Sequence, residues 1–289
     1  MKSLVCGLLY LAIMHSYSQF VVSGIVLDGK DSRPIPYVNI GIENTLIGTA
    51  SFENGVFNLE IPNDNIKDSL VFSALGYQRK KISVLVLGDK DSITLEAQNT
   101  NLDEVVVSFK KQKLPTIIDG LTKPNYGFLG IYWDGKYISR PDGGSAMTIL
   151  LNKKSQKIFL KHAQLFIHNS HLPTFDLRVR IMNVKDGKPH HDVYQKNILV
   201  SSTKKKGGLV IDLREYQIVL TEPFFLVFEW IISEENSKKL SDKDIDQQIT
   251  AFSVRDIQEY VGYERKSSMS SWEQSKKVVV ANVSYALLN

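Results

Sequence analysis

The sequence predicts an all-β protein made of two consecutive β-sandwiches. Short segments with strand-like apolar patterns recur along the 289 residues, and Gly, Pro, Asn and Asp residues separate many of them. Between residues 20 and 108, no stretch keeps the 3.6-residue apolar period of a helix over ten residues. The length fits two domains, since one domain usually takes about 100–200 residues.

The overall composition is that of a folded globular protein, with 43% hydrophobic and 23% charged residues. The net charge of +4 is small for this length. A dedicated nucleic-acid-binding protein normally concentrates its basic residues. We therefore expect no nucleic acid among the partners.

The N-terminus has the pattern of a secretory signal peptide. Lys2 precedes an apolar run over residues 4–14, and Ser16 and Ser18 occupy the two small-residue positions of a signal-peptidase site. We expect residues 1–18 to be removed on export. The apolar run is too short to cross a bilayer, so no transmembrane segment is expected after cleavage.

The single cysteine, Cys6, lies inside this apolar run. A lipid-attachment signal needs its cysteine after the run, so lipidation is not expected. The mature chain, from Gln19 onward, would then contain no cysteine. This removes disulfides, thiol catalysis and thiolate metal sites from consideration, and the domains must be stable through their cores alone.

The first domain is expected over residues 19–108. Its segments are short and closely spaced, which is typical of a β-sandwich. The candidate strands are residues 20–27, 36–43, 47–52, 55–61, 68–75, 78–86, 91–96 and 103–108.

The Asn54-Gly55 pair is a strong hairpin signal, because both central residues of a type I′ turn need positive φ. Behind the pair, Phe57, Leu59 and Ile61 occupy alternate positions, as in a half-buried strand. We expect a hairpin here whose outgoing strand has one apolar face.

Four motifs of this domain occur in an order that suggests a family. They are G-I-V-L-D-G-K-D-S-R-P-I-P-Y-V-N-I (24–40), I-G-T-A-S-F-E-N-G-V-F-N-L (47–59), L-V-F-S-A-L-G-Y (70–77) and L-D-E-V-V-V (102–107). This succession resembles the carboxypeptidase-regulatory-like domain, a transthyretin-like, Ig-like β-sandwich. One departure is Phe52, where such domains often carry Asp, and this puts any polar role of that position in doubt.

The resemblance implies a role in the Gram-negative cell envelope. There the domain often precedes the plug and barrel of TonB-dependent nutrient receptors. A receptor barrel needs many strands of about ten residues, and too little chain follows residue 108. The resemblance therefore implies a docking or assembly module without the receptor, in the periplasm or associated with the outer membrane.

A linker is expected over residues 109–125, because K-K-Q-K-L-P-T (110–116) is basic and contains a proline. The remaining residues, 126–289, are predicted to form a second β-sandwich, for which a jelly roll is one candidate. The expected strands are 145–151, 157–169, 174–184, 193–202, 208–214, 223–233, 248–254 and 276–287, and the one helical candidate is 254–261.

Two strands of this domain have informative patterns. In residues 174–181, apolar residues alternate with Asp176, Arg178 and Arg180, which predicts one buried and one solvent-facing side. In residues 224–232 both faces are apolar, which predicts a central strand covered on both sides.

Catalytic and metal-binding patterns are weak. His162, His168, His171, His190 and His191 do not have the spacing of zinc ligands, and the last two are adjacent and would point to opposite sides of an extended strand. We interpret all five as surface or turn residues.

Asp242, Asp244 and Asp246 have the alternate spacing of a calcium loop but lack its glycine and its final glutamate. We interpret them as an acidic surface loop, with a structural calcium ion as the alternative. No other cofactor is expected.

Glu229 lies within the apolar strand, where a buried carboxylate is a candidate for a perturbed pKa. It could equally pair with Arg178 or Arg180. No second carboxylate is placed beside it by any motif, so a glycosidase pair is not indicated. We predict no catalytic residues, no metal ligands and no enzymatic activity.

Aromatic residues are the remaining candidates for ligand binding. Tyr132, Trp133 and Tyr137 follow the linker, and Trp272 comes later. Aromatic rings stack on pyranose faces, so a sugar-binding platform is one interpretation and core packing is the other.

The sequence thus predicts a non-catalytic exported envelope protein that binds glycan or another envelope protein, such as an outer-membrane receptor. A glycan hydrolase with an unrecognised site and a structural or adhesion protein remain the alternatives.

Overall fold

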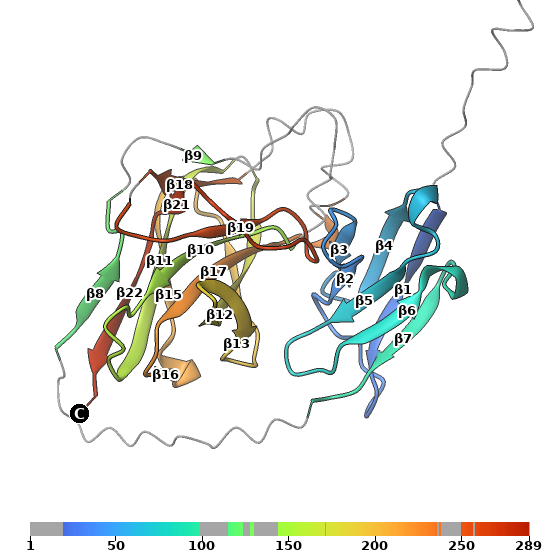
Figure 1. The fold of residues 1–289 in the computed structure, drawn as a ribbon, viewed down its shortest axis with the longest axis horizontal. Helices are drawn as coiled ribbons and strands as arrows, with labels where there is room; N and C mark the ends of the chain where they lie inside the picture. Colours follow the sequence, from blue (N-terminus) through green and yellow to red (C-terminus); the bar gives the residue numbers. More distant parts are fainter. Residues whose placement is uncertain are drawn as a thin grey trace, which may run out of the picture.

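The computed structural model describes residues 20–98, 115–123, 128–129, 144–170, 172–235, 237, 250–256 and 258–288. These residues form two β-sandwiches that lie side by side (Figure 1). The all-β prediction is therefore confirmed. Among the described residues, no helix has the length and hydrophobicity needed to span a membrane.

The N-terminal sandwich consists of two small sheets (Figure 1). One sheet has the order β4 (Val56–Ile61), β1 (Phe20–Asp28), β7 (Asp91–Leu95), and the other has the order β3 (Gly48–Ala50), β2 (Asn39–Gly41), β5 (Ser69–Ser73), β6 (Lys80–Ser83). The strand β1 pairs antiparallel with β4 and parallel with β7. Apolar side chains from both sheets form one core, in which Phe57 and Phe72 make an edge-to-face contact.

The turn at residues 52–56 differs from the predicted type I′ hairpin. Gly55 has φ +77°, but Asn54 is not in the positive-φ region. The amide of Gly55 donates to Phe52 O at 3.0 Å, and the amide of Phe52 donates to Val56 O at 2.8 Å. These bonds enclose a three-residue loop that ends in a left-handed glycine.

The strands on either side of this loop, β3 and β4, pair with β2 and β1 respectively. The loop therefore carries the chain from one sheet to the other. The predicted hairpin is wrong, although the predicted apolar face of β4 is confirmed, since Phe57, Leu59 and Ile61 are buried.

The C-terminal sandwich has two larger sheets. The first has the order β13 (Lys188–Asp192), β12 (Phe175–Lys185), β17 (Phe224–Ile231), β10 (Ala146–Leu151), β19 (Tyr263–Arg265), β20 (Glu273–Gln274), and β14 (Ile198–Ser202) also pairs with β12. The second has the order β21 (Val278–Val279), β18 (Thr250–Arg255), β11 (Ile158–Ser170), β22 (Ala281–Leu287), β8 (Ile117–Gly120). Three more strands belong to the second sheet. β15 (Gly207–Asp212) and β16 (Val219–Leu220) pair with β11, and β9 (Phe128–Leu129) pairs with β18.

Side chains that alternate along β12 and β17 define the two faces of the first sheet. Phe175, Leu177, Val179 and Ile181 belong to the main core between the sheets, as their spacing predicts. The opposite face was predicted to be solvent-exposed, but Arg178 is buried there. The reason is that the N-terminal sandwich covers this face.

Three further predictions concern chain segments. The segment 254–261 is not a helix, because β18 continues to Arg255 and turns follow it. The strand β8, within the range expected for the linker, pairs with β22 and belongs to the C-terminal sheet. The predicted signal peptide and the strand at 103–108 lie outside the described residues.

Candidate functional site

The strand register aligns a row of residues across four strands of the first C-terminal sheet. Arg178 on β12 lies opposite Glu229 on β17, Glu229 lies opposite Ala146 on β10, and Ala146 lies opposite Arg265 on β19. Residues that are opposite in adjacent strands share one face of the sheet. The small side chain of Ala146 leaves room for Arg265 to reach Glu229.

Glu229 accepts hydrogen bonds from three arginines through its two oxygens. Oε2 accepts from Nε of Arg178 at 2.8 Å and from Nη1 of Arg180 at 3.3 Å. Oε1 accepts from Nη2 of Arg265. The predicted pairing of Glu229 with Arg178 or Arg180 is confirmed with both, and Arg265 was not foreseen.

A second carboxylate belongs to the same cluster. Asp192 on β13 accepts from Nε and Nη2 of Arg180 at 2.8 and 2.6 Å, which is the bidentate geometry of a strong charge-assisted pair. Arg180 therefore lies between two carboxylates, Asp192 and Glu229. We call Arg178, Arg180, Arg265, Asp192 and Glu229 the arginine cluster.

The surroundings of Glu229 determine its protonation. Complete burial opposes ionisation, but the charges of Arg178, Arg265 and Arg180 outweigh this effect and hold the pKa of Glu229 well below its usual range. Burial also acts on Arg180, yet Asp192 and Glu229 raise the pKa of its guanidinium. Glu229 is therefore ionised at neutral pH.

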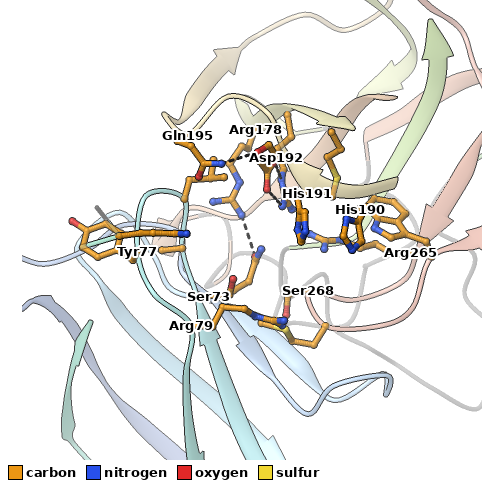
Figure 2. Close-up of a pocket in the computed structure, with 18 residues that line it drawn as sticks. Ser73, Tyr77, Arg79, Arg178, His190, His191, Asp192, Gln195, Arg265 and Ser268 are labelled. Carbon is orange, nitrogen blue, oxygen red and sulfur yellow. Dashed lines mark hydrogen bonds and ion pairs between the residues drawn. The ribbon is translucent and has the colours of Figure 1, made fainter. Parts of the chain in front are cut away.

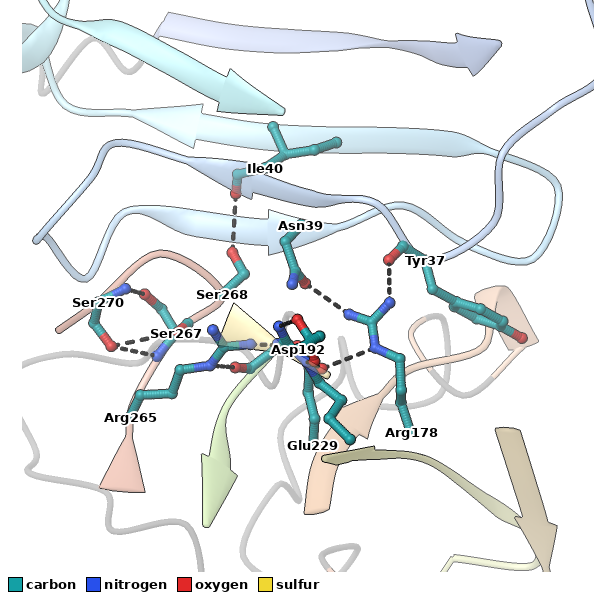
Figure 3. A network of polar contacts seen from close by, with 12 residues as sticks. Tyr37, Asn39, Ile40, Arg178, Asp192, Glu229, Arg265, Ser267, Ser268 and Ser270 are labelled. Carbon is teal, nitrogen blue, oxygen red and sulfur yellow. Dashed lines mark hydrogen bonds and ion pairs between the residues drawn. The ribbon is translucent and has the colours of Figure 1, made fainter. Parts of the chain in front are cut away.

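The arginine cluster also joins the two sandwiches (Figure 3). Nη1 of Arg178 donates to Tyr37 O at 2.8 Å, and Nη2 donates to Asn39 Oδ1 at 3.1 Å. Beside these contacts, Ser268 Oγ donates to Ile40 O at 3.0 Å. The two domains are thus in direct polar contact through a buried arginine.

A cavity of about 470 Å³ lies at this junction, lined by residues of both sandwiches. Figure 2 shows Ser73 and Arg79 of the N-terminal sandwich on the side of the pocket opposite Arg178 and Arg265 of the C-terminal sandwich. We call this cavity the interdomain pocket. Its volume is within the range of small-ligand sites, about 300–1,000 Å³.

Trp272 is the only one of the four predicted ligand-binding aromatics within the described residues, and it lines the interdomain pocket. The guanidinium carbon of Arg265 lies 5.0 Å from the centroid of its ring, which is a cation–π contact. Tyr132, Trp133 and Tyr137 lie outside the described residues, as do His171, Asp242, Asp244 and Asp246.

The two adjacent histidines also line the pocket. The ring centroids of His190 and His191 are 3.6 Å apart, so the expectation that they point to opposite sides is wrong. The pairing of β13 with β12 is irregular between Met182 and Val184, and a β-bulge places two residues opposite one. Among the described residues, no three His, Cys, Asp or Glu side chains gather as a metal site would require.

The fold and this geometry can be set beside known proteins. The CarboxypepD_reg-like domain matches residues 22–107. The match covers about a third of the chain. The resemblance inferred from the four motifs is therefore confirmed for the N-terminal third of the chain.

Two further similarities were found. The TonB-dependent receptor P3 of Formosa agariphila is 35% identical over 86 residues, which are 30% of this chain and 8% of the receptor. This chain therefore corresponds to a small part of the receptor's length. The crystal structure of the cysteine protease and lectin-like domains of Cwp84, a surface layer associated protein of Clostridium difficile, is similar with 10% identity, a TM-score of 0.36, and coverage of 96% of this chain and 60% of that one.

Arg265 and the pocket itself were missed by the sequence analysis. The tripeptide Tyr263-Glu264-Arg265 is a short strand with Tyr263 buried, but three residues carry too little pattern to predict a strand. Its pairing with β10 depends on contacts over more than 100 residues of sequence.

Proposed function

We propose that this protein is an exported, non-catalytic component of the Gram-negative cell envelope and that it binds a ligand in the interdomain pocket. The pocket is the observation that carries this proposal. It is lined from both sandwiches, so it exists only when the two domains are docked as they are here.

The lining of the pocket supports a hydrophilic ligand. Most of its residues are polar or charged, and among the lining residues only Ala74, Leu75, Met182, Met269 and Trp272 are apolar. A half-buried tryptophan beside hydrogen-bonding side chains suits a sugar, whose ring has an apolar face and polar edges. Glycan is therefore the first ligand class to test.

The carboxylates of the arginine cluster argue against hydrolysis of glycosides. That reaction needs a carboxyl group that is protonated near neutral pH to act as the acid. Glu229 is held ionised by three arginines, and both oxygens of Asp192 accept hydrogen bonds from Arg180. Glu229 therefore does not suit the role of the acid, and Arg180 occupies both oxygens of Asp192.

The envelope assignment is supported by the CarboxypepD_reg-like domain and by the similarity to a TonB-dependent receptor. The signal-peptide pattern of the N-terminal residues agrees with it. On this basis we place the protein in the periplasm or at the outer membrane, where a receptor or another envelope protein is the natural docking partner of the N-terminal domain.

The test is binding of the mature protein, residues 19–289, to a panel of soluble polysaccharides by affinity electrophoresis, with product release measured in parallel. We expect retardation by at least one polysaccharide, no new reducing ends, and loss of retardation in Trp272→Ala. The control Tyr216→Ala removes a half-buried aromatic that packs against Tyr194, outside the pocket.

Each other outcome refutes a part of the proposal. Release of reducing ends would indicate a hydrolase. Absence of both retardation and release would favour a structural or adhesion protein. Retardation that survives Trp272→Ala would place the ligand outside the interdomain pocket.

A further inference from the structure

The arginine cluster contains more positive than negative charge. Three guanidinium groups, of Arg178, Arg180 and Arg265, face two carboxylates, of Asp192 and Glu229. Every one of these side chains has an exposed fraction of 12% or less. One positive charge is therefore buried at the junction without a counter-charge inside the cluster.

Uncompensated charge is unfavourable in a buried place, because water no longer solvates it. Arg265 carries most of this cost. Its burial, together with the charges of Arg180 and Arg178, outweighs the attraction of Glu229 and lowers its pKa to about 10. The group still remains charged at neutral pH.

Arg265 also has unused hydrogen-bond donors. Nε donates to Gly144 O at 3.0 Å and Nη2 donates to Glu229, but Nη1 has no hydrogen-bond partner within the described part of the chain. The side chain is 8% exposed and lines the interdomain pocket (Figure 2). The ring of Trp272 lies beside the guanidinium group, with its centroid 5.0 Å from the guanidinium carbon.

The other titratable groups of the pocket do not remove this excess. Arg79 is paired with Glu43 at 2.9 Å near the surface, which leaves no net charge. His190 and His191 are exposed. Partial desolvation and the charge of His191 lower the pKa of His190. A histidine side chain is either neutral or positively charged, so neither residue supplies a counter-charge.

We propose that the interdomain pocket binds a hydrophilic ligand through an oxyanion group, a carboxylate or a phosphate, with Arg265 as the principal anion-binding residue. This inference rests on the proposed function, because it specifies the ligand chemistry of the same pocket. The oxyanion accepts from Nη1 of Arg265 and supplies the missing negative charge. Gln98 and Gln195 also line the pocket, and Nε2 of Gln195 donates to Asp192 O at 2.6 Å.

The experiment measures the thermal unfolding temperature of the mature protein with three probes: inorganic phosphate, glucuronate, and neutral glucose. Sodium chloride at equal ionic strength provides the baseline. A ligand at ten to a hundred times its dissociation constant raises the melting temperature of a protein of this size by roughly 2–10 °C. We expect a saturable rise with phosphate or glucuronate and none with glucose.

The deciding variant is Arg265→Gln, which leaves two guanidinium groups for two carboxylates. We expect its melting temperature to be independent of both anions. Arg214→Gln is the matched control, because Arg214 is an exposed arginine paired with Asp212 outside the pocket; it should respond as the wild type does.

A second variant keeps the test valid if Arg265→Gln fails to fold. Gln98 lines the pocket and is exposed, so Gln98→Glu adds a carboxylate there with little change of shape. We expect at least a twofold weaker apparent affinity for the anions.

The outcomes separate the two anion sources and the two proposals. A rise with phosphate alone assigns a phosphorylated ligand, and a larger rise with glucuronate assigns a carboxylated sugar. An anion response that persists in both variants, or one no larger than that to chloride, overturns the inference. If the anion inference is overturned but a neutral polysaccharide is retained in a manner that depends on Trp272, the proposed ligand-binding function survives. If no polysaccharide is retained either, both the anion inference and the proposed function fail.

Discussion

Replacing Glu229 by Gln should strongly destabilise the C-terminal sandwich. The substitution keeps the shape but removes the negative charge that three buried arginines share. The arginine cluster would then hold three positive charges and one negative charge. The new amide group would also direct N–H donors at guanidinium donors.

The expected loss follows from measurements on buried ion pairs, in which removal of one partner costs about 3–5 kcal/mol. For a protein of this size, about 1 kcal/mol corresponds to about 2–4 °C in melting temperature, so the transition should fall by roughly 6–20 °C. Circular dichroism at pH 7 measures the melting temperature, and urea unfolding measures the free energy. Glu222→Gln, an exposed glutamate that precedes the same strand, serves as the control.

The double variant Glu229→Gln/Arg265→Gln tests the physical reason. It restores the net charge of the cluster to its original value, so it should be more stable than the sum of the single effects predicts, by at least about 1 kcal/mol for contacting charges. A loss below about 1 kcal/mol in Glu229→Gln, or additive effects in the double variant, would show that the cluster is solvated and that its charges do not act together.

Three further predictions concern Gly55, the pH dependence of the Glu229→Gln effect, and the N-terminus. A non-glycine residue at position 55 would have to adopt φ +77° and place its Cβ 2.9 Å from Val26 O. Gly55→Val should therefore lower the free energy of unfolding, measured in urea, by on the order of 1–3 kcal/mol. The control Gly88→Val, at a position with open space around it, should lose less than half as much. Because the folded protein lowers the pKa of Glu229, ionised Glu229 stabilises the fold at pH values above 4.5, its ordinary pKa. The difference in unfolding free energy between the wild type and Glu229→Gln should therefore be constant above about pH 5 and become smaller as the pH falls further. A difference that does not depend on pH would contradict this assignment. N-terminal sequencing of the exported protein should begin at or near Gln19, and a mature chain that retains the first residues would refute export.

The sequence predicts those features of the fold that depend on local pattern. Alternating apolar residues correctly placed Phe175 and Leu177 in the core, and the doubly apolar segment around Phe225 is indeed covered on both sides. Family motifs correctly identified the N-terminal domain. The Asn54-Gly55 turn was misjudged, because the local pair does not reveal that the two flanking strands belong to different sheets.

The features that sequence alone could not supply depend on docking of the two domains. An arginine on the polar side of a strand is expected to be solvated, and only the neighbouring sandwich, through Tyr37 O and Asn39, buries Arg178. Pairing of Glu229 with Arg178 followed from neighbouring strands, whereas Arg265 comes from a short strand without a recognisable pattern. The pocket is missed for the same reason, because it is a property of the junction.

The position of the cluster also constrains how binding and domain docking relate. Arg178 uses donors for both Glu229 of its own sandwich and the backbone of the N-terminal sandwich, while Arg265 binds the other oxygen of Glu229 and lines the pocket. A ligand held by residues of both sandwiches binds only when the two sandwiches are docked. By linkage, the bound ligand must then stabilise the docked arrangement by the difference between its binding free energies for the docked and undocked arrangements. Conversely, a variant that weakens docking without touching the pocket, such as Ser271→Ala, which removes the hydrogen bond from Ser271 to Asn44, should weaken ligand binding. Independent domains joined by a passive linker would show no such reciprocity.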